Sequence, residues 1–135
     1  MGWYSARLGE YATAQTHCQA ALRLYRDHDN PIGEAAALDS LGYIAHHTSH
    51  HRQAIDYYQQ TLILLRAQGN SYEAANTLNK LGHPHISLNE HEQARVVWRE
   101  ALQLYQEQGR DAEATRVQQQ LDALDGLDRI PDPQK

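Results

Sequence analysis

The sequence has little of what several protein classes require. Its 135 residues include one cysteine, Cys18, so no internal disulfide can form. The 12 basic residues are scattered and outnumbered by 17 acidic ones, which argues against direct contact with nucleic acid. No apolar run approaches membrane-spanning length, and the start MGWYSARLGE lacks the pattern of a secretory signal. We therefore expect one cytoplasmic domain with a modest core.

Signatures of catalysis are missing as well. The sequence has no glycine-rich phosphate loop after a strand, no HExxH, no nucleophile elbow and no pair of carboxylates in an apolar setting. Glu73, Glu90, Glu92 and Asp111 lie at predicted helix starts, where a carboxylate caps the helix and complements its dipole. We expect a non-enzymatic protein that needs no cofactor.

What the sequence does contain is a repeat of 40 residues. LGYIAHHTSHHRQAIDYYQQTLILL aligns with LGHPHISLNEHEQARVVWREALQLY, and MGWYSARLGEYATAQTHCQAALRLY aligns with both. A leucine followed by glycine recurs at Gly42 and Gly82. Three positions are identical in every copy, and a fourth holds Cys18, Tyr58 or Trp98; the identical positions are Ala14, Ala54 and Ala94, then Leu22, Leu62 and Leu102, then Leu24, Leu64 and Leu104.

Within each copy the apolar residues follow helical spacing, and strand signals are absent. Turn residues in HDNP and QGNS separate the periodic segments. Gly42 and Gly82 lower helix propensity by roughly 1 kcal/mol each relative to alanine, so their recurrence predicts close helix contacts, with Ala54 and Ala94 as the matching flat spots. The expected helices are 11–28, 32–48, 51–68, 71–88, 91–108 and 111–125.

These residues together resemble the motif of the tetratricopeptide repeat family. The motif positions are Leu38, Leu41, Gly42, Ala54, Tyr58 and Thr61 in one copy, and Leu78, Leu81, Gly82, Ala94, Trp98 and Ala101 in the next. The resemblance implies an all-α, right-handed superhelical solenoid of antiparallel helix pairs. Its parts would be a domain at 1–125, with repeats at about 1–30, 31–70 and 71–110 and a capping helix at 111–125, followed by a disordered tail at 126–135.

The sequence departs from the family in several ways. The period is 40 rather than the usual value of about 34, a long form similar to kinesin light chains and to the C-terminal arrays of actinobacterial transcriptional activators. The family's closing proline is replaced by Arg26, Arg66 and Gln106, and Pro84 should kink or loosen its helix. Residues 8–11 align with the later turns, so the chain begins in mid-repeat; we expect a fragment whose open N-terminal end pairs two chains as a homodimer.

The resemblance also implies a binding groove lined by the first helix of each pair. Such a wall of aromatic, histidine and asparagine side chains suits a protein or peptide partner. The expected groove residues are Trp3, Ala6, Arg7, Ala36, Asp39, Tyr43, His46, His47, Asn76, Asn79, His83, Ile86, Ser87, Arg116, Gln119 and Ala123. The alternative interpretation is that these residues form only a solvated helix surface.

The stretch HHTSHH holds four of the nine histidines and raises the question of a metal site. On one helix His46 with His50, and His47 with His51, would suit zinc or nickel. However, the repeat places Thr48–His51 in a turn, which breaks this pairing, so we favour a histidine-rich polar turn over a metal centre.

The sequence thus predicts a protein-interaction module, the sensor or scaffold part of a larger bacterial regulator of transcription. One alternative is a small-molecule or metal-responsive sensor that uses Tyr43, His46, His47 and His83. A second alternative is a structural dimerisation unit whose groove stays empty.

Overall fold

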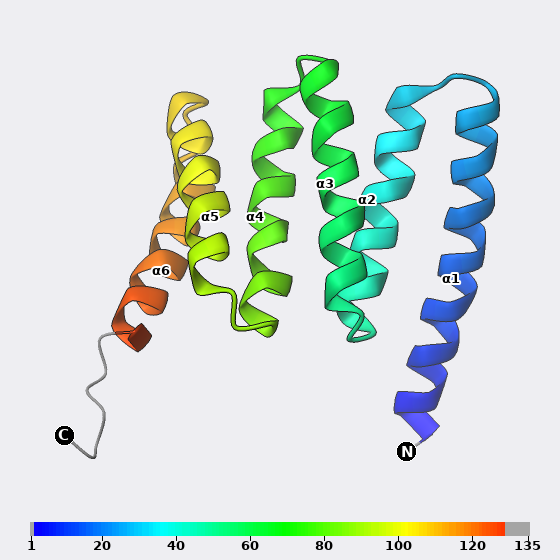
Figure 1. Cartoon of the computed structure of the whole chain (residues 1–135), viewed down its shortest axis with the longest axis horizontal. Helices are drawn as coiled ribbons and strands as arrows, with labels where there is room; N and C mark the ends of the chain where they lie inside the picture. The colour runs from blue at the N-terminus through cyan, green and yellow to red at the C-terminus, as the bar shows by residue number, and fades with distance from the viewer. Residues whose placement is uncertain (1, 129–135) are drawn as a thin grey trace.

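The computed structural model describes residues 2–128, with side chains from Arg7 onward, and this part of the chain is a row of six α-helices without a strand (Figure 1). The predicted all-α repeat is confirmed, and helices two to five begin and end within one residue of the predicted bounds. The helices are α1 (Gly2–Asp27), α2 (Pro31–His47), α3 (His51–Ala67), α4 (Ser71–Ser87), α5 (His91–Glu107) and α6 (Asp111–Asp128).

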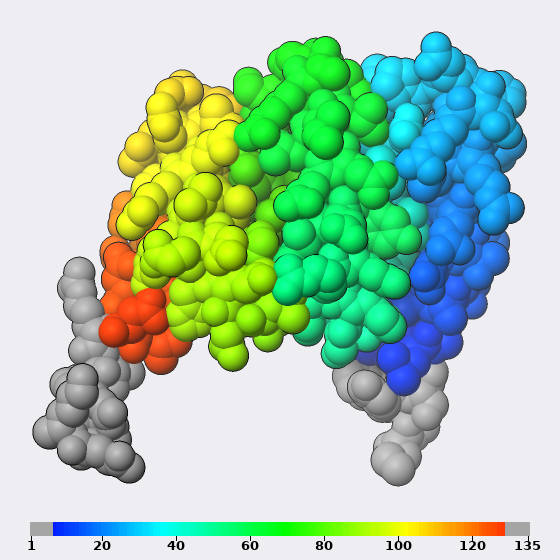
Figure 2. Space-filling model, viewed as in Figure 1, coloured from blue at the N-terminus to red at the C-terminus, as the bar shows by residue number. Residues whose placement is uncertain are grey.

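The helices form two layers. Each helix packs against the next one along the chain, and the space-filling view shows them stacked in chain order (Figure 2). Helices two apart are neighbours within a layer: Lys80 of α4 pairs with Asp39 of α2, whereas Arg66 of α3 pairs with Glu100 of α5. We call the surface of α2, α4 and α6 the even face and the surface of α1, α3 and α5 the odd face.

The turns recur every 20 residues. Each turn has one residue in the left-handed region that favours glycine. These residues are Asp29, Ser49, Gly69, Asn89 and Gly109, with φ between 49° and 68°. The side chains of Asn30 and Asn70 then cap α2 and α4 by accepting the amide protons of Gly33 (3.0 Å) and Glu73 (3.1 Å).

The two Leu-Gly sites are close helix contacts in the core. A Cβ on Gly42 would lie 2.6 Å from the ring of Tyr58, and a Cβ on Gly82 would overlap the indole of Trp98. That indole also donates a hydrogen bond to the carbonyl of Asn79 at 2.9 Å. The predicted close approach is therefore confirmed, and the atoms nearest to each glycine belong to an aromatic ring.

The N-terminal helix differs from the prediction. A turn was expected at residues 8–11, yet α1 is continuous from Gly2 to Asp27. Gly9 stands 20 residues before Asp29 but is helical, and a Cβ there would meet nothing within 4 Å. Glycine permits a turn but does not force one. Arg7–Glu10 are exposed, so no buried contact rewards folding back, and a continuing helix satisfies the backbone hydrogen bonds.

Two further predictions concern α4 and α6. Pro84 lies inside α4 as predicted and is buried, and the helix runs on to Ser87. The expected end of α6 at residue 125 is short by three residues, because α6 continues to Asp128. Arg95 of α5 pairs with both Asp125 and Asp128 and so holds this last turn in place. Residues 129–135 of the expected tail lie outside the described residues.

Candidate binding surface

The even face contains a crevice between α2 and α4. Its volume is about 350 Å³, and Thr61 and Leu65 of α3 lie beneath it. Ala36 and Asp39, both expected in a groove, line the α2 side, and Glu73 and Thr77 line the α4 side, with Ile32 also exposed at the edge; the other lining residues are Ala35, Ser40, Gln68 and Asn70. The crevice therefore combines an apolar floor with polar walls, as peptide sites do.

Asp39 is held by a cation from the neighbouring helix. Lys80 Nζ donates to both carboxylate oxygens, at 2.9 and 3.1 Å, and joins α4 to α2. Both side chains keep partial exposure, so the pair fixes the spacing of the two helices more than it stabilises the fold. A partner at this position meets a neutralised pair and not an isolated carboxylate.

Asn76 and Asn79 are likewise tied to neighbouring helices. The side-chain oxygen of Asn76 accepts from Tyr105 Oη at 2.8 Å and from Arg110 Nη2 at 2.7 Å. That of Asn79 accepts from Gln120 Nε2 of α6 at 3.1 Å. These two predicted groove residues therefore orient the helices of the even face, and their oxygens already have donors.

At the other end of α2 the structure brings four predicted residues together. Tyr43 and His47 stack with ring centroids 3.9 Å apart, and His46 meets His47 edge to face at 5.3 Å. His83 of α4 lies 6.4 Å from His46 between centroids. His51, at the start of α3, completes the group, because its Nδ1 lies 3.0 Å from Nδ1 of His46. We call these five residues the histidine cluster.

The cluster disfavours positive charge. Burial lowers the pKa of His46 to about 4, and repulsion from His51, His47 and His83 adds to the effect. Burial also lowers the pKa of His83, with His47 contributing. The short contact between His46 and His51 needs a ring nitrogen that donates and a neutral one that accepts. The lowered pKa values of His46 and His83 keep these two rings neutral at neutral pH, beside the stacked rings of Tyr43 and His47.

The HHTSHH stretch does not form the helical pairs that its spacing suggests. Thr48 and Ser49 make the predicted turn, and α3 begins at His51, so His46 pairs with His51 and not with His50. His50 Nδ1 faces the hydroxyl of Thr48 at 2.9 Å. Within residues 7–128 no three side chains of His, Cys, Asp or Glu are grouped so that they could hold a metal ion.

Other predicted residues are spread over α1, α4 and α6. Arg7 lies on α1, and the side chain of Trp3 is outside the described residues. Ile86 is partly buried against the core. Arg116 and Gln119 are exposed on α6, where Gln119 faces a depression beside the end of α5.

Sequence reasoning missed Lys80, Gln120 and His51 as members of this surface. Lys80 and Gln120 each lie one residue from a predicted groove residue, so the prediction missed them by one position in assigning residues to the helix face. His51 carried a usable signal, because the repeat already placed it just after the turn that follows His46 and His47.

Comparison with known proteins identifies one of the helix pairs. Residues 74–107 match the tetratricopeptide repeat family. The matched segment starts in the first turn of α4 and ends with α5, so it covers one hairpin of the row. Repeats of this family are non-enzymatic modules that mediate protein–protein interaction. No curated protein matches the chain.

None of the helices in the described part of the chain is long and apolar enough to cross a membrane.

Proposed function

We propose that this protein is an interaction module that binds a segment of a partner protein along the even face. The observation that carries the proposal is the crevice between α2 and α4, together with the histidine cluster that lies further along the same two helices. The match of α4 and α5 to a protein-binding repeat supports the same class of function.

The two parts of this surface suit different parts of a partner segment. The crevice offers an apolar floor of Leu65 with the hydroxyls of Thr61 and Thr77, where a small apolar side chain can be buried. The cluster offers flat rings, among them Tyr43 with 48% of its surface exposed. Aromatic side chains with a polar tip are the usual anchors of protein interfaces.

The cellular context of the proposal rests on the length of the repeat. The 40-residue period is similar to the arrays at the C-terminal ends of actinobacterial transcriptional activators, in which such repeats act as sensors or scaffolds. We therefore propose that the chain serves as the partner-sensing part of a larger bacterial regulator.

A display library of random peptides tests the proposal when it is selected against the full chain. We expect enriched peptides whose affinity falls at least tenfold in Tyr43→Ala and in Ala36→Lys, both at exposed positions, while the matched change Arg23→Ala on the odd face has no effect. Peptides that bind all three variants equally would contradict a site on the even face.

A second candidate is a small-molecule or metal-responsive sensor, favoured by the convergence of Tyr43, His46, His47 and His83. Because no three-ligand metal group stands ready among the described residues, a planar organic ligand stacked on the half-exposed ring of Tyr43 fits this candidate better than a metal ion. A thermal-shift screen distinguishes the candidates: the sensor predicts stabilisation by a small ligand that His46→Gln abolishes, whereas the interaction module predicts stabilisation by peptides only.

A further inference from the structure

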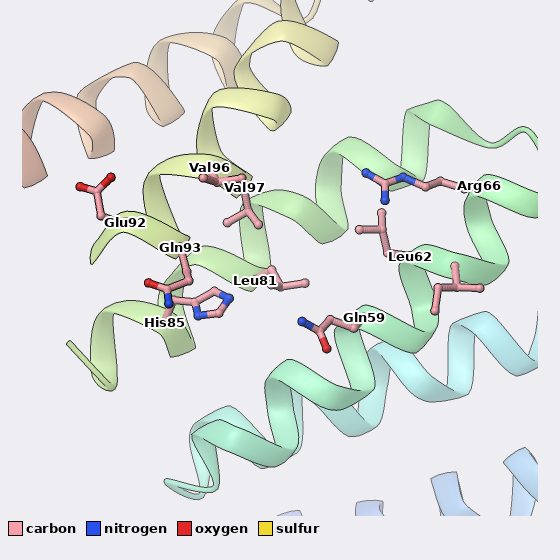
Figure 3. Close-up of a pocket in the computed structure, with 10 residues that line it drawn as sticks. Gln59, Leu62, Arg66, Leu81, His85, Glu92, Gln93, Val96 and Val97 are labelled. Atoms are coloured by element: carbon pink, nitrogen blue, oxygen red, sulfur yellow. The ribbon is translucent and has the colours of Figure 1, made fainter. Parts of the chain in front are cut away.

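A large apolar groove lies on the odd face, opposite the proposed partner site. It runs between α3 and α5 over α4 and has a volume of about 630 Å³. Figure 3 shows Leu62 of α3, Leu81 of α4 and Val97 of α5 pointing toward the space between the helices. Ile63 and Val96 also line the groove and are 67% and 62% exposed.

The repeat supplies an internal comparison for this groove. The positions 40 residues earlier belong to the space between α1 and α3, where Arg23 replaces Ile63 and Asp56 replaces Val96. The position of Val97 is held there by Tyr57, whose larger side chain packs onto the core between those helices. Only the groove between α3 and α5 therefore has apolar side chains at both exposed positions and a small residue that leaves it open.

Charged contacts bound the groove at both ends. Arg66 of α3 pairs with Glu100 of α5 at one end, and Arg52 donates twice to Glu90 at the other, at 3.0 and 3.3 Å. His85 Nδ1 donates to the same Glu90 carboxylate, 2.9 Å away. Residues 52 and 66 are 14 positions apart, which corresponds to about 21 Å along a helix. The apolar part is therefore long enough for about three to four helical turns and no more.

The surroundings decide what kind of occupant fits. The exposed residues beside the groove are polar or charged, namely Asp56, Gln60, Arg99 and Gln103. A second copy of the chain would have to bury these groups to reach the roughly 800 Å² per partner of a stable interface. A single helix lying in the groove covers the apolar strip and leaves the charges in water.

We propose that this groove binds one amphipathic helix of a partner protein. Its apolar side chains, spaced i, i+4, i+7, lie on Ile63, Val96 and the floor at Leu81. Arg66 remains 52% exposed in its ion pair, and the side chain of Glu92 at the opposite end is 79% exposed. The helix therefore carries an acidic residue at the Arg66 end and a basic residue at the Glu92 end, which fixes its direction.

A library of helix-forming peptides of about 14 residues, displayed and selected against the full chain, tests this inference. The decisive variant carries Ile63→Arg and Val96→Asp, which installs the residues of the equivalent positions between α1 and α3. Both sites are exposed, so the variant should melt within a few degrees of the parent. We expect enriched amphipathic peptides whose affinity falls at least tenfold in this variant and severalfold in Arg66→Glu.

The matched controls are Tyr43→Ala on the even face and Arg23→Ala between α1 and α3, which should leave the affinity unchanged. The inference is overturned if no amphipathic peptide is enriched, if the enriched peptides bind the double variant as tightly as the parent, or if they depend on Tyr43. Self-association of the chain that the double variant abolishes would also overturn it, in favour of a second copy as the occupant.

Discussion

The hairpins α2–α3 and α4–α5 are built on the same internal contacts but present different surfaces. Gly42 against Tyr58 in the first matches Gly82 against Trp98 in the second, and Ala54 and Ala94 are fully buried in both. These shared residues set the spacing of the helices. The comparison shows that packing is what repeats, so the residues that differ between the hairpins are where distinct chemistry can be placed.

The differences lie on the two faces. On the even face, the first hairpin has His46 where the second has Ile86, and the histidine cluster forms only around the first. On the odd face, Asp56 of the first hairpin becomes Val96 in the second, next to the apolar groove. Each face therefore gains its special site from a departure from the repeat and not from the repeat itself.

Replacing Gly42 or Gly82 with alanine should reveal the largest difference in stability between the two hairpins. Gly82→Ala forces a Cβ into the Trp98 indole, which is held by its hydrogen bond to Asn79, and should lower the free energy of unfolding by about 2 kcal/mol. Gly42→Ala meets the smaller ring of Tyr58 and should cost about 1 kcal/mol, since the gain in helix propensity offsets part of the overlap.

Urea unfolding of both variants measures this difference. Gly9→Ala is the control, because a Cβ there meets nothing within 4 Å, and it should stabilise α1 slightly. A neutral or stabilising effect at Gly82 would show that the predicted overlap does not exist.

Acid should weaken the first hairpin through His46. The pKa of His46 is about 4 in the folded chain and about 6.5 when unfolded, so between these values the unfolded state binds more protons. The stabilisation is complete above pH 6.5 and is lost as the pH falls toward 4. Because the side chain is partly exposed, we expect a loss of roughly 1 kcal/mol over this window.

Chemical unfolding at pH 7 and pH 4.5 checks this prediction in the parent and in His46→Gln. The substitution should remove most of the extra loss at low pH, whereas His28→Gln, in the exposed turn after α1, should not. Equal pH profiles for the parent and His46→Gln would mean that the cluster does not resist protonation.

Substitutions in the turns should give the smallest differences in the free energy of unfolding. Ser49 has φ of 64° in the first hairpin, where the later turns have glycine at Gly69 and Gly109. Ser49→Gly should raise the free energy of unfolding by about 0.5 kcal/mol, and Gly69→Ala should lower it by about 1 kcal/mol. Thermal melting resolves changes of this size, and destabilisation by Ser49→Gly would contradict the left-handed turn.

The sequence predicts the helical row well because its strongest signals are local and repeated. The 40-residue spacing of Gly42 and Gly82 with their alanines, together with turn residues every 20 positions, placed α2 to α5 within one residue. The same signals wrongly predicted a turn near Gly9 in α1, because Gly9 lacks the buried contacts that make the chain fold back at the other turns. Local sequence does not reveal whether a segment has a neighbour to pack against.

The candidate site is predicted less completely for a related reason. The resemblance to tetratricopeptide repeats placed Asp39, His46 and His83 among the groove residues, but a shift of one residue separates Asn79 from Lys80 and hides which side chain crosses to the next helix. The odd-face groove escaped prediction altogether. The sequence signal for this groove was the replacement of Arg23 by Ile63 at the same position of the next repeat. This replacement indicates a groove only once α3 and α5 are known to lie side by side.

The packing of glycine against an aromatic ring in both hairpins is the contact on which every assignment to the two faces depends. Nuclear Overhauser contacts measure it directly in solution. We predict strong cross-peaks from the Gly82 Hα protons to the Trp98 indole and from the Gly42 Hα protons to the Tyr58 ring, with both glycines shifted by the ring currents. Unshifted glycine signals without these cross-peaks would contradict the account.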